Sequence, residues 1–140
     1  MITCTRCIEW DMGHRVLNHE GKCARLHGHR YKAEITCYAN DLDEVGRVID
    51  FGVIKAKLGE WIDDTWDHRT MICRDDTELL QVNLSLKGAH FVVSNNNPTA
   101  ENIAQMLYYQ AHQMLTAHGV TPVKVRVWET PNCYAECSPI

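Results

Sequence analysis

The chain of 140 residues has only four prolines and two phenylalanines, and its 14 lysines and arginines are outnumbered by 18 aspartates and glutamates. The net charge is −4 and the basic residues are scattered, so we expect neither nucleic acid nor an anionic membrane as a partner. No run approaches the roughly 20 apolar residues that a membrane-spanning helix needs. The sequence also lacks a low-complexity tract, an internal repeat and an obvious linker. These absences, together with the length, predict one compact domain over residues 1–140.

The first residues show no basic segment followed by an apolar one, so we expect no signal peptide and a cytoplasmic location. Seven cysteines, an odd number, favour reduced thiols over a disulfide framework. The spacings of Cys4/Cys7 and Cys133/Cys137 are those that a four-thiolate zinc site could use. However, residues 2–12 have the pattern of a strand, and strand residues three apart point to opposite faces, which favours isolated thiols.

Alternation of apolar and polar residues predicts strands over residues 2–12, from about residue 29 to residue 37, and over residues 123–129. In the last of these, Glu129 continues the face formed by Val123, Val125 and Val127. We expect the first two strands to form an antiparallel pair joined by the loop 15–26.

Helical spacing of apolar residues predicts two helices. The first follows Asp50, which can act as its N-cap, and its apolar residues are Phe51, Ile54, Leu58, Trp61 and Ile62. The second begins at Pro98-Thr99 and ends at Gly119. Residues 70–97 are less regular, with a short helix expected around 77–87. The fold class is therefore α+β, an antiparallel sheet with two helices over one face.

The segment from Cys23 to His29 contains a thiol followed by His27-Gly28-His29, and His14 lies upstream. Strand alternation places His14, His27 and His29 on the apolar side of the predicted strand pair, at ends that the pairing brings close. A buried imidazole costs free energy unless it is hydrogen-bonded or ligated. A single histidine is most simply a core or turn residue, but three at one corner indicate a metal site. Imidazole ligands suit zinc, although copper, nickel and iron are also compatible.

Two further groups have chemistry of interest. Asp67-His68 follows the first predicted helix, and an acid beside an imidazole can relay protons; a polar helix end is the simpler alternative. Glu129 places a carboxylate where the strand alternation predicts an apolar side chain. It either turns to solvent at the strand end or meets a buried donor, such as the NH groups of a ligand.

The order and spacing of six motifs resemble those of the 6-pyruvoyl-tetrahydropterin synthase family over nearly the whole chain. These motifs are His14, Cys23-x-x-x-His27-Gly28-His29, Val48–Phe51, Asp67-His68, Pro98–Asn102 and Trp128–Thr130. The resemblance implies the tunnelling fold, in which a four-stranded antiparallel sheet and two helices assemble into trimers or hexamers. In such assemblies the sheets close a barrel and the active sites lie at subunit interfaces.

The three-residue spacer between Cys23 and His27 resembles the bacterial branch of the family that forms 6-carboxy-tetrahydropterin. That branch implies a zinc-dependent lyase acting on 7,8-dihydroneopterin triphosphate, with release of acetaldehyde and triphosphate, in 7-deazaguanine (queuosine precursor) synthesis. One alternative is the pyruvoyl-forming synthase, whose members have a longer spacer. A second alternative is a zinc- or pterin-binding protein without turnover. The complete set of one cysteine and three histidines disfavours a neopterin aldolase.

The resemblance also implies a role for each matching residue. His14, His27 and His29 correspond to the zinc ligands, and Cys23 corresponds to the proton acceptor at the substrate side chain. Asp67 and His68 correspond to a proton relay, Glu129 to the pterin anchor, and Thr99 and Glu101 to further pterin contacts. Thr99 can also be explained as the N-cap of its helix.

The chain departs from the family pattern in three places. These are Trp10–Gly13 before the first histidine, Arg69–Met71 after the relay, and a longer segment leading to Pro98. They leave every expected catalytic position in place and bear on the details of substrate recognition.

Overall fold

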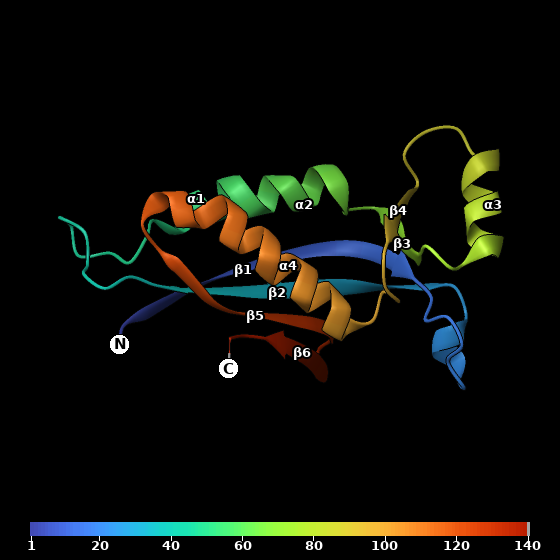
Figure 1. The fold of residues 1–140 in the computed structure, drawn as a ribbon, viewed down its shortest axis with the longest axis horizontal. Helices are drawn as coiled ribbons and strands as arrows, with labels where there is room; N and C mark the ends of the chain where they lie inside the picture. The colour runs from blue at the N-terminus through green and yellow to red at the C-terminus, as the bar shows by residue number, and fades with distance from the viewer. Residues whose placement is uncertain (140) are drawn as a thin grey trace.

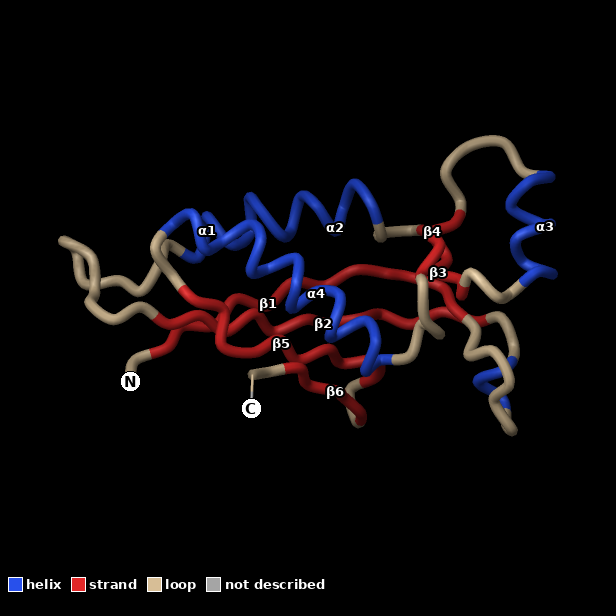
Figure 2. Tube along the Cα trace, viewed as in Figure 1, coloured by secondary structure: helices blue, strands red, loops and turns tan. Residues whose placement is uncertain are grey.

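The computed structural model describes residues 1–139, apart from the side chain of Val123. Ile140, the last residue of the predicted domain, and the Val123 side chain, part of the predicted alternation, lie outside the described atoms. Six strands form one sheet in the order β4-β3-β1-β2-β5-β6, and Figure 2 shows them as the red segments of the trace. The strands are β1 (Thr3–His14), β2 (His27–Tyr38), β3 (Arg69–Cys73), β4 (Phe91–Ser94), β5 (Thr121–Thr130) and β6 (Cys133–Cys137).

A long antiparallel hairpin, β1 with β2, forms the centre of the sheet. The two strands pair over their full lengths, ending with His14 opposite His27. Successive strand side chains point to opposite faces, so one face of β1 is buried and the other carries the exposed residues Glu9 and Asp11. The predicted strand pair is confirmed, and both strands extend beyond the predicted ends, far enough to include the histidines.

The four-stranded antiparallel sheet expected from the sequence is present as β1, β2, β5 and β6. Two short strands, β3 and β4, extend it on the β1 side and run parallel to their neighbours, so the whole sheet is mixed. Strand β3 pairs with β1 only over Met12–His14. Gly13 permits this approach, because a Cβ atom there would lie 2.7 Å from Oγ1 of Thr70.

Two helical segments cover one face of the sheet, as predicted (Figure 1). The first runs through α1 (Phe51–Ile54), a π-helical turn (Lys55–Gly59) and α2 (Glu60–Thr65), and Oδ1 of Asp50 caps it by accepting a 2.7 Å hydrogen bond from Gly52 N–H. The second is α4 (Ala100–Leu115), which continues as a 3₁₀ turn, Thr116–His118. It stops at Gly119, whose φ of 75° is in the left-handed region that glycine adopts easily.

The expected short helix around 77–87 is also present, as α3 (Thr77–Ser85) with Asp76 as its N-cap. It stands beyond the end of the sheet, next to β3 and β4 (Figure 1). Within residues 1–139, no helix combines the length and the apolar character that crossing a membrane requires.

The core lies between the sheet and the two long helical segments. Its largest fully buried side chains include Trp10, Tyr31, Ile35, Ile54, Leu58, Ile62, Ile103 and Leu107. All seven cysteines are free. Cys4 packs against the core while Cys7 is exposed, so the two thiols lie on opposite faces of β1. Among the described residues, the cysteines form no group with metal-binding spacing.

Candidate active site

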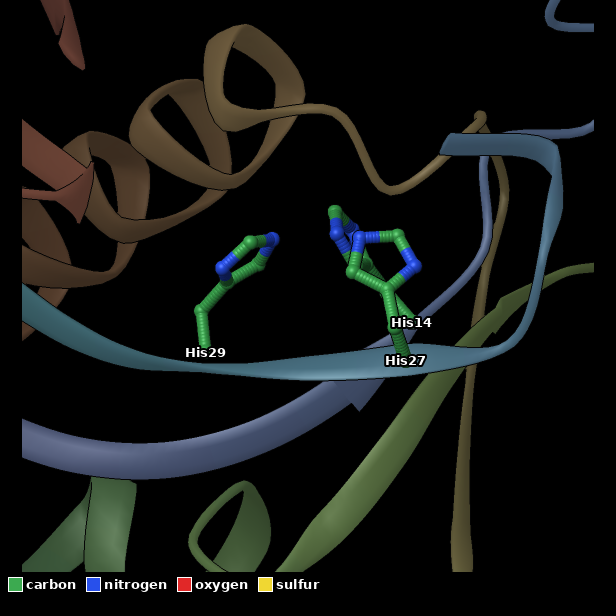
Figure 3. A group of neighbouring side chains, drawn as sticks. All are labelled: His14, His27 and His29. Carbon is green, nitrogen blue, oxygen red and sulfur yellow. The ribbon is translucent and has the colours of Figure 1, made fainter. Parts of the chain in front are cut away.

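Three imidazoles meet at the end of the β1–β2 hairpin (Figure 3). His14 is the last residue of β1, His27 is its partner at the start of β2, and His29 lies two residues further along the same face of β2. The ring centroids are 4.7 to 5.2 Å apart, and one nitrogen from each ring lies within 4.8 Å of the others. The predicted convergence of these three histidines is therefore observed.

Backbone carbonyls orient two of the rings. Nδ1 of His14 lies 2.7 Å from the carbonyl oxygen of Pro98, and Nδ1 of His27 lies 2.5 Å from that of Arg25. A carbonyl oxygen can only accept, so the neutral form of each ring carries its proton on Nδ1 and has its lone pair on Nε2. This arrangement is the usual one for a metal-ligating histidine, whose second nitrogen donates to an orienting group.

Glu129, near the end of β5, faces the same cluster. Its Oε1 lies 3.4 Å from Nε2 of His14 and 3.8 Å from Nε2 of His29. The sequence left open whether Glu129 turns to solvent or inward, and the structure places it inward with a quarter of its side chain exposed. The carboxylate thus borders the space between the rings.

The electrostatics of the cluster favour neutral imidazoles. Burial lowers the pKa of His14 and of His29 below the ordinary imidazole value, and Glu129 offsets only part of this effect. Both rings should therefore be neutral at physiological pH, which is the form that binds a metal.

The residues present fit a zinc ion. Nε2 of His14 and Nε2 of His29 are buried and have no hydrogen-bond partner within residues 1–139. A buried polar atom without a partner is costly, and ligation removes that cost. Three imidazoles satisfy the three-ligand pattern of catalytic zinc sites and leave one position free.

Cys23 lies in the short 3₁₀ turn Lys22–Ala24, in the loop between the two histidine-bearing strands. Its side chain is half-buried, and its carbonyl oxygen accepts a 2.8 Å hydrogen bond from Val16 N–H. The thiol does not join the group of ligand atoms formed by the imidazoles. The hairpin therefore brings Cys23 to the same end of the molecule as the histidines without making it a fourth ligand.

Asp67 and His68 form a pair on the other face of the hairpin. Oδ2 of Asp67 lies 3.0 Å from Nδ1 of His68. One side-chain oxygen or nitrogen from each of Asp11, Asp67 and His68 lies within 4.8 Å of the others, and Asp11 belongs to the exposed face of β1. Partial burial raises the pKa of Asp67, but the hydrogen bonds from Asp11 and His68 outweigh it and hold that pKa below the ordinary value. His68 is 77% exposed and has a φ of 61°. The structure brings this pair together but turns it away from the three imidazoles.

Thr99 and Glu101 lie at the start of α4. Oγ1 of Thr99 accepts a hydrogen bond of 3.2 Å from Asn102 N–H, so the residue does cap the helix. Glu101 is exposed in the first turn. Their proposed contacts with a pterin remain predictions.

Two features of the site were missed by the sequence reasoning. One is the Pro98 carbonyl that orients His14, which no side-chain pattern could reveal. The other is Tyr31, which lies in the second predicted strand. Its ring lies 6.0 Å from His14 and 5.7 Å from His29, and its hydroxyl is buried without a partner among the described residues. Its position two residues after His29, on the same face, was the available signal.

A family model described as 6-pyruvoyl tetrahydropterin synthase matches residues 3–139. The chain belongs to this family. Among its relatives, the 6-carboxy-5,6,7,8-tetrahydropterin synthase of Rickettsia conorii is 43% identical over 137 residues, covering 97% of this chain and 99% of that protein. A probable 6-carboxy-5,6,7,8-tetrahydropterin synthase of Halobacterium salinarum is 34% identical over 126 residues, covering 90% of this chain and 79% of that protein. The names of these relatives confirm the prediction of a lyase of the 6-pyruvoyl tetrahydropterin synthase family.

Solved structures confirm the fold of the family. An uncharacterised protein from Wolinella succinogenes superposes with a TM-score of 0.87 at 22% identity, covering 99% of this chain and 98% of that one. The 6-pyruvoyl tetrahydropterin synthase of Caenorhabditis elegans superposes with a TM-score of 0.71 at 21% identity, covering 99% and 96%. The predicted tunnelling fold is therefore confirmed for the single subunit.

Proposed function

We propose that the chain is a zinc-dependent 6-carboxy-5,6,7,8-tetrahydropterin synthase. It would convert 7,8-dihydroneopterin triphosphate to 6-carboxy-tetrahydropterin, acetaldehyde and triphosphate, as a step in 7-deazaguanine (queuosine precursor) synthesis. The proposal rests mainly on the three imidazoles that converge at the hairpin end with Glu129 beside them. The 43% identity to a protein of this name over almost the full length supports it. Seven free thiols suit a cytoplasmic location.

His14, His27 and His29 would hold the metal, which supplies Lewis acidity toward the oxygens of the substrate side chain. Pro98 and Arg25 would keep two of the rings in the ligating tautomer through their carbonyl oxygens. Glu129 would anchor the pterin, because its carboxylate can accept hydrogen bonds from ring NH groups at the edge of the cluster. Thr99 and Glu101 would add contacts to the pterin from the start of α4.

Cys23 would accept a proton from the substrate side chain as a thiolate. Asp67 and His68 would move the second proton, with Asp67 fixing the ring of His68 through their 3.0 Å contact. Since this pair faces away from the imidazoles of its own subunit, we propose that it serves the metal site of a neighbouring copy.

A homo-oligomer of the trimeric or hexameric type would provide that neighbour. Residues Thr3–Trp10 of β1 pair only with β2, and β6 is an outer strand, so these two edges of the described sheet can pair with other copies.

The test is to give the purified zinc-loaded protein 7,8-dihydroneopterin triphosphate and to follow acetaldehyde and the pterin product. Acetaldehyde formed together with 6-carboxy-tetrahydropterin is the expected result. Triphosphate release with a pyruvoyl product and no acetaldehyde would reassign the chain to the other branch of the family. Binding of zinc and pterin with no product at all would leave a binding protein.

A further inference from the structure

Three consecutive asparagines, Asn95, Asn96 and Asn97, precede Pro98 between β4 and α4. The structure distinguishes the third from the others, because Asn95 and Asn96 are exposed and Asn97 is half-buried. The amide of Asn97 pairs with the backbone of Leu17 at two points. Its Oδ1 accepts from Leu17 N–H at 2.8 Å, and its Nδ2 donates to the carbonyl oxygen of Leu17 at 2.8 Å.

Leu17 belongs to the loop 15–26, which carries Cys23. The neighbour of Leu17, Val16, donates its N–H to the carbonyl oxygen of Cys23 at 2.8 Å. The Asn97 side chain is therefore connected to the backbone of Cys23 by its hydrogen bonds to Leu17 and, one residue along the chain, by the hydrogen bond from Val16. A side-chain amide that bonds both the backbone N–H and the carbonyl oxygen of one residue fixes the backbone there, as pairing with a neighbouring β-strand would.

Asn97 is itself held firmly. Its carbonyl oxygen accepts from Thr99 N–H at 2.8 Å and from Nδ2 of Asn102 at 2.8 Å. The next carbonyl, that of Pro98, accepts from Nδ1 of His14 at 2.7 Å. One short segment at the start of α4 thus contacts both the loop of the cysteine and a ligand of the candidate metal site.

We propose that Asn97 is a positioning residue that holds the loop 15–26, and with it the thiol of Cys23, at a fixed place relative to His14. The inference deepens the proposed function, in which the thiol must meet a substrate bound at the metal. The structural part of the inference concerns the loop alone and can be tested without any reaction.

The first measurement is the rate at which iodoacetamide alkylates Cys23 in the zinc-loaded protein, followed by mass spectrometry of the peptide that contains it. Asn97→Ala removes both hydrogen bonds to Leu17 and should raise this rate by about ten- to thirtyfold, because local opening of the loop becomes easier. Asn95→Ala and Asn96→Ala are matched controls and should leave the rate unchanged. Zinc content should remain at the wild-type level in all three variants.

The second measurement is turnover. Asn97→Ala should lower kcat by about tenfold with little change in KM, since the thiol and not the metal site is displaced. If the wild-type protein proves to have no lyase activity, the proposed function fails while the alkylation result still decides the role of Asn97.

A second variant covers the case in which Asn97→Ala does not fold. Asn97→Asp keeps the size and the acceptor but places another acceptor against the Leu17 carbonyl, so it should also raise the alkylation rate; Asn96→Asp controls for the added charge. Alkylation rates equal to those of the neighbouring variants would overturn the proposal. So would a loss of zinc in proportion to the gain in alkylation, because Asn97 would then support the whole site and not the loop.

Discussion

His14 shows how burial of a single side chain points to a proposed role as a metal ligand. Its ring is 1% exposed, and one nitrogen is satisfied by the Pro98 carbonyl. The other nitrogen is buried without a hydrogen-bond partner among residues 1–139. A core histidine of purely structural use would have both nitrogens paired. The unpaired Nε2, aimed at two other imidazoles, is what distinguishes this residue from a satisfied core histidine.

The proposed function predicts separable contributions from the thiol of Cys23 and the histidines. Cys23→Ala should keep the wild-type zinc content while turnover falls by about 10²- to 10⁴-fold, the usual contribution of a general acid or base. His14→Ala should lose zinc, because two imidazoles cannot complete the ligand set. Metal analysis beside activity measurements would check both. Loss of zinc from Cys23→Ala would show that the thiol is a ligand.

Glu129 allows a second experiment on a single residue. Glu129→Gln keeps the size of the side chain and removes its charge, so a pterin product should bind about ten- to hundredfold more weakly, the range for a hydrogen bond to a charged group. Zinc content should be unchanged. Titration of the pterin product into the metal-loaded variant measures the pterin affinity, and metal analysis measures the zinc content. Unchanged pterin affinity together with weakened zinc binding would make Glu129 a metal ligand instead.

At the scale of elements, one charged residue ties the short helix α3 to the end of β1. Asp76 is buried, caps α3 through Leu79 N–H, and forms a bidentate pair with the guanidinium of Arg15, the residue after His14. The same carboxylate therefore begins a helix and ties it to the end of β1. Removing Arg15 would leave the Asp76 carboxylate buried without its cation, whereas removing Asp76 would leave Arg15 paired with Glu78 at 3.0 Å.

The pair formed by Asp76 and Arg15 predicts that the folded protein loses stability in acid. The Arg15 guanidinium holds the pKa of Asp76 below the ordinary value of about 3.9. The stabilisation is therefore fully present above that value and is lost as the pH falls below it toward the depressed folded pKa. Asp76→Asn should lower the free energy of unfolding by about 1 to 3 kcal/mol at neutral pH. The difference from wild type should shrink below about pH 4.

Chemical denaturation of metal-free protein at several pH values would measure this difference without a contribution from zinc release. Asp75→Asn is the matched control, because Asp75 is the exposed neighbour of the same type. A difference that stays constant down to pH 2 would contradict the assignment of the stabilisation to an ionised Asp76.

Sequence patterns predicted the long elements and the helix α3 but missed the short strands. Strands β1 and β2 and helix α4 bury one continuous face each, so their periodicity is visible in the residues themselves. Strands β3, β4 and β6 have four or five residues. Each of them forms because it pairs with the edge of a neighbouring strand: β3 with β1, β4 with β3, and β6 with β5. This is a tertiary effect that their own residues do not reveal. Gly13 is the one sequence feature that reflects the approach of β3, and its meaning depends on Thr70 across the gap.

The same distinction applies to the site. The three histidines were predictable because strand alternation and the motif spacing pointed to one corner. The carbonyl of Pro98 and the amide of Asn97 were not, since a backbone acceptor has no residue type and one of three adjacent asparagines looks like the others. The face on which Asp67 and His68 lie also depended on how α2 returns to the edge of β1.

For the whole molecule, the main consequence is that a single chain separates two sets of proposed catalytic groups. The imidazoles and Glu129 lie on the helix-covered face of the hairpin, while Asp67 and His68 contact Asp11 on its other face. If each active site combines both sets, the two must come from different copies. This can be tested with variants that are inactive separately.

Mixing Cys23→Ala with His68→Ala, after unfolding and joint refolding, should restore a measurable fraction of the wild-type acetaldehyde release. Some interfaces would then pair an intact Cys23 from one copy with an intact His68 from the other. Mixing Cys23→Ala with His27→Ala should restore nothing, because both groups belong to the same hairpin. Equal recovery in the two mixtures, or none in either, would argue against sites shared between subunits.

The position of the histidines along the chain also determines the order in which the parts of the candidate site are synthesised. The three proposed ligands lie within residues 14–29, and the pairing of β1 with β2 brings them together. The Pro98 carbonyl and Glu129 are translated later, the latter about 100 residues after His29, which corresponds to roughly 5 to 20 s at typical synthesis rates. A growing chain would thus hold all three proposed nitrogen ligands before the Pro98 carbonyl that orients His14 and the Glu129 carboxylate exist. The identity of the first metal ion bound would then depend on which free ions are present around the ribosome, and not on the selectivity of the finished pocket.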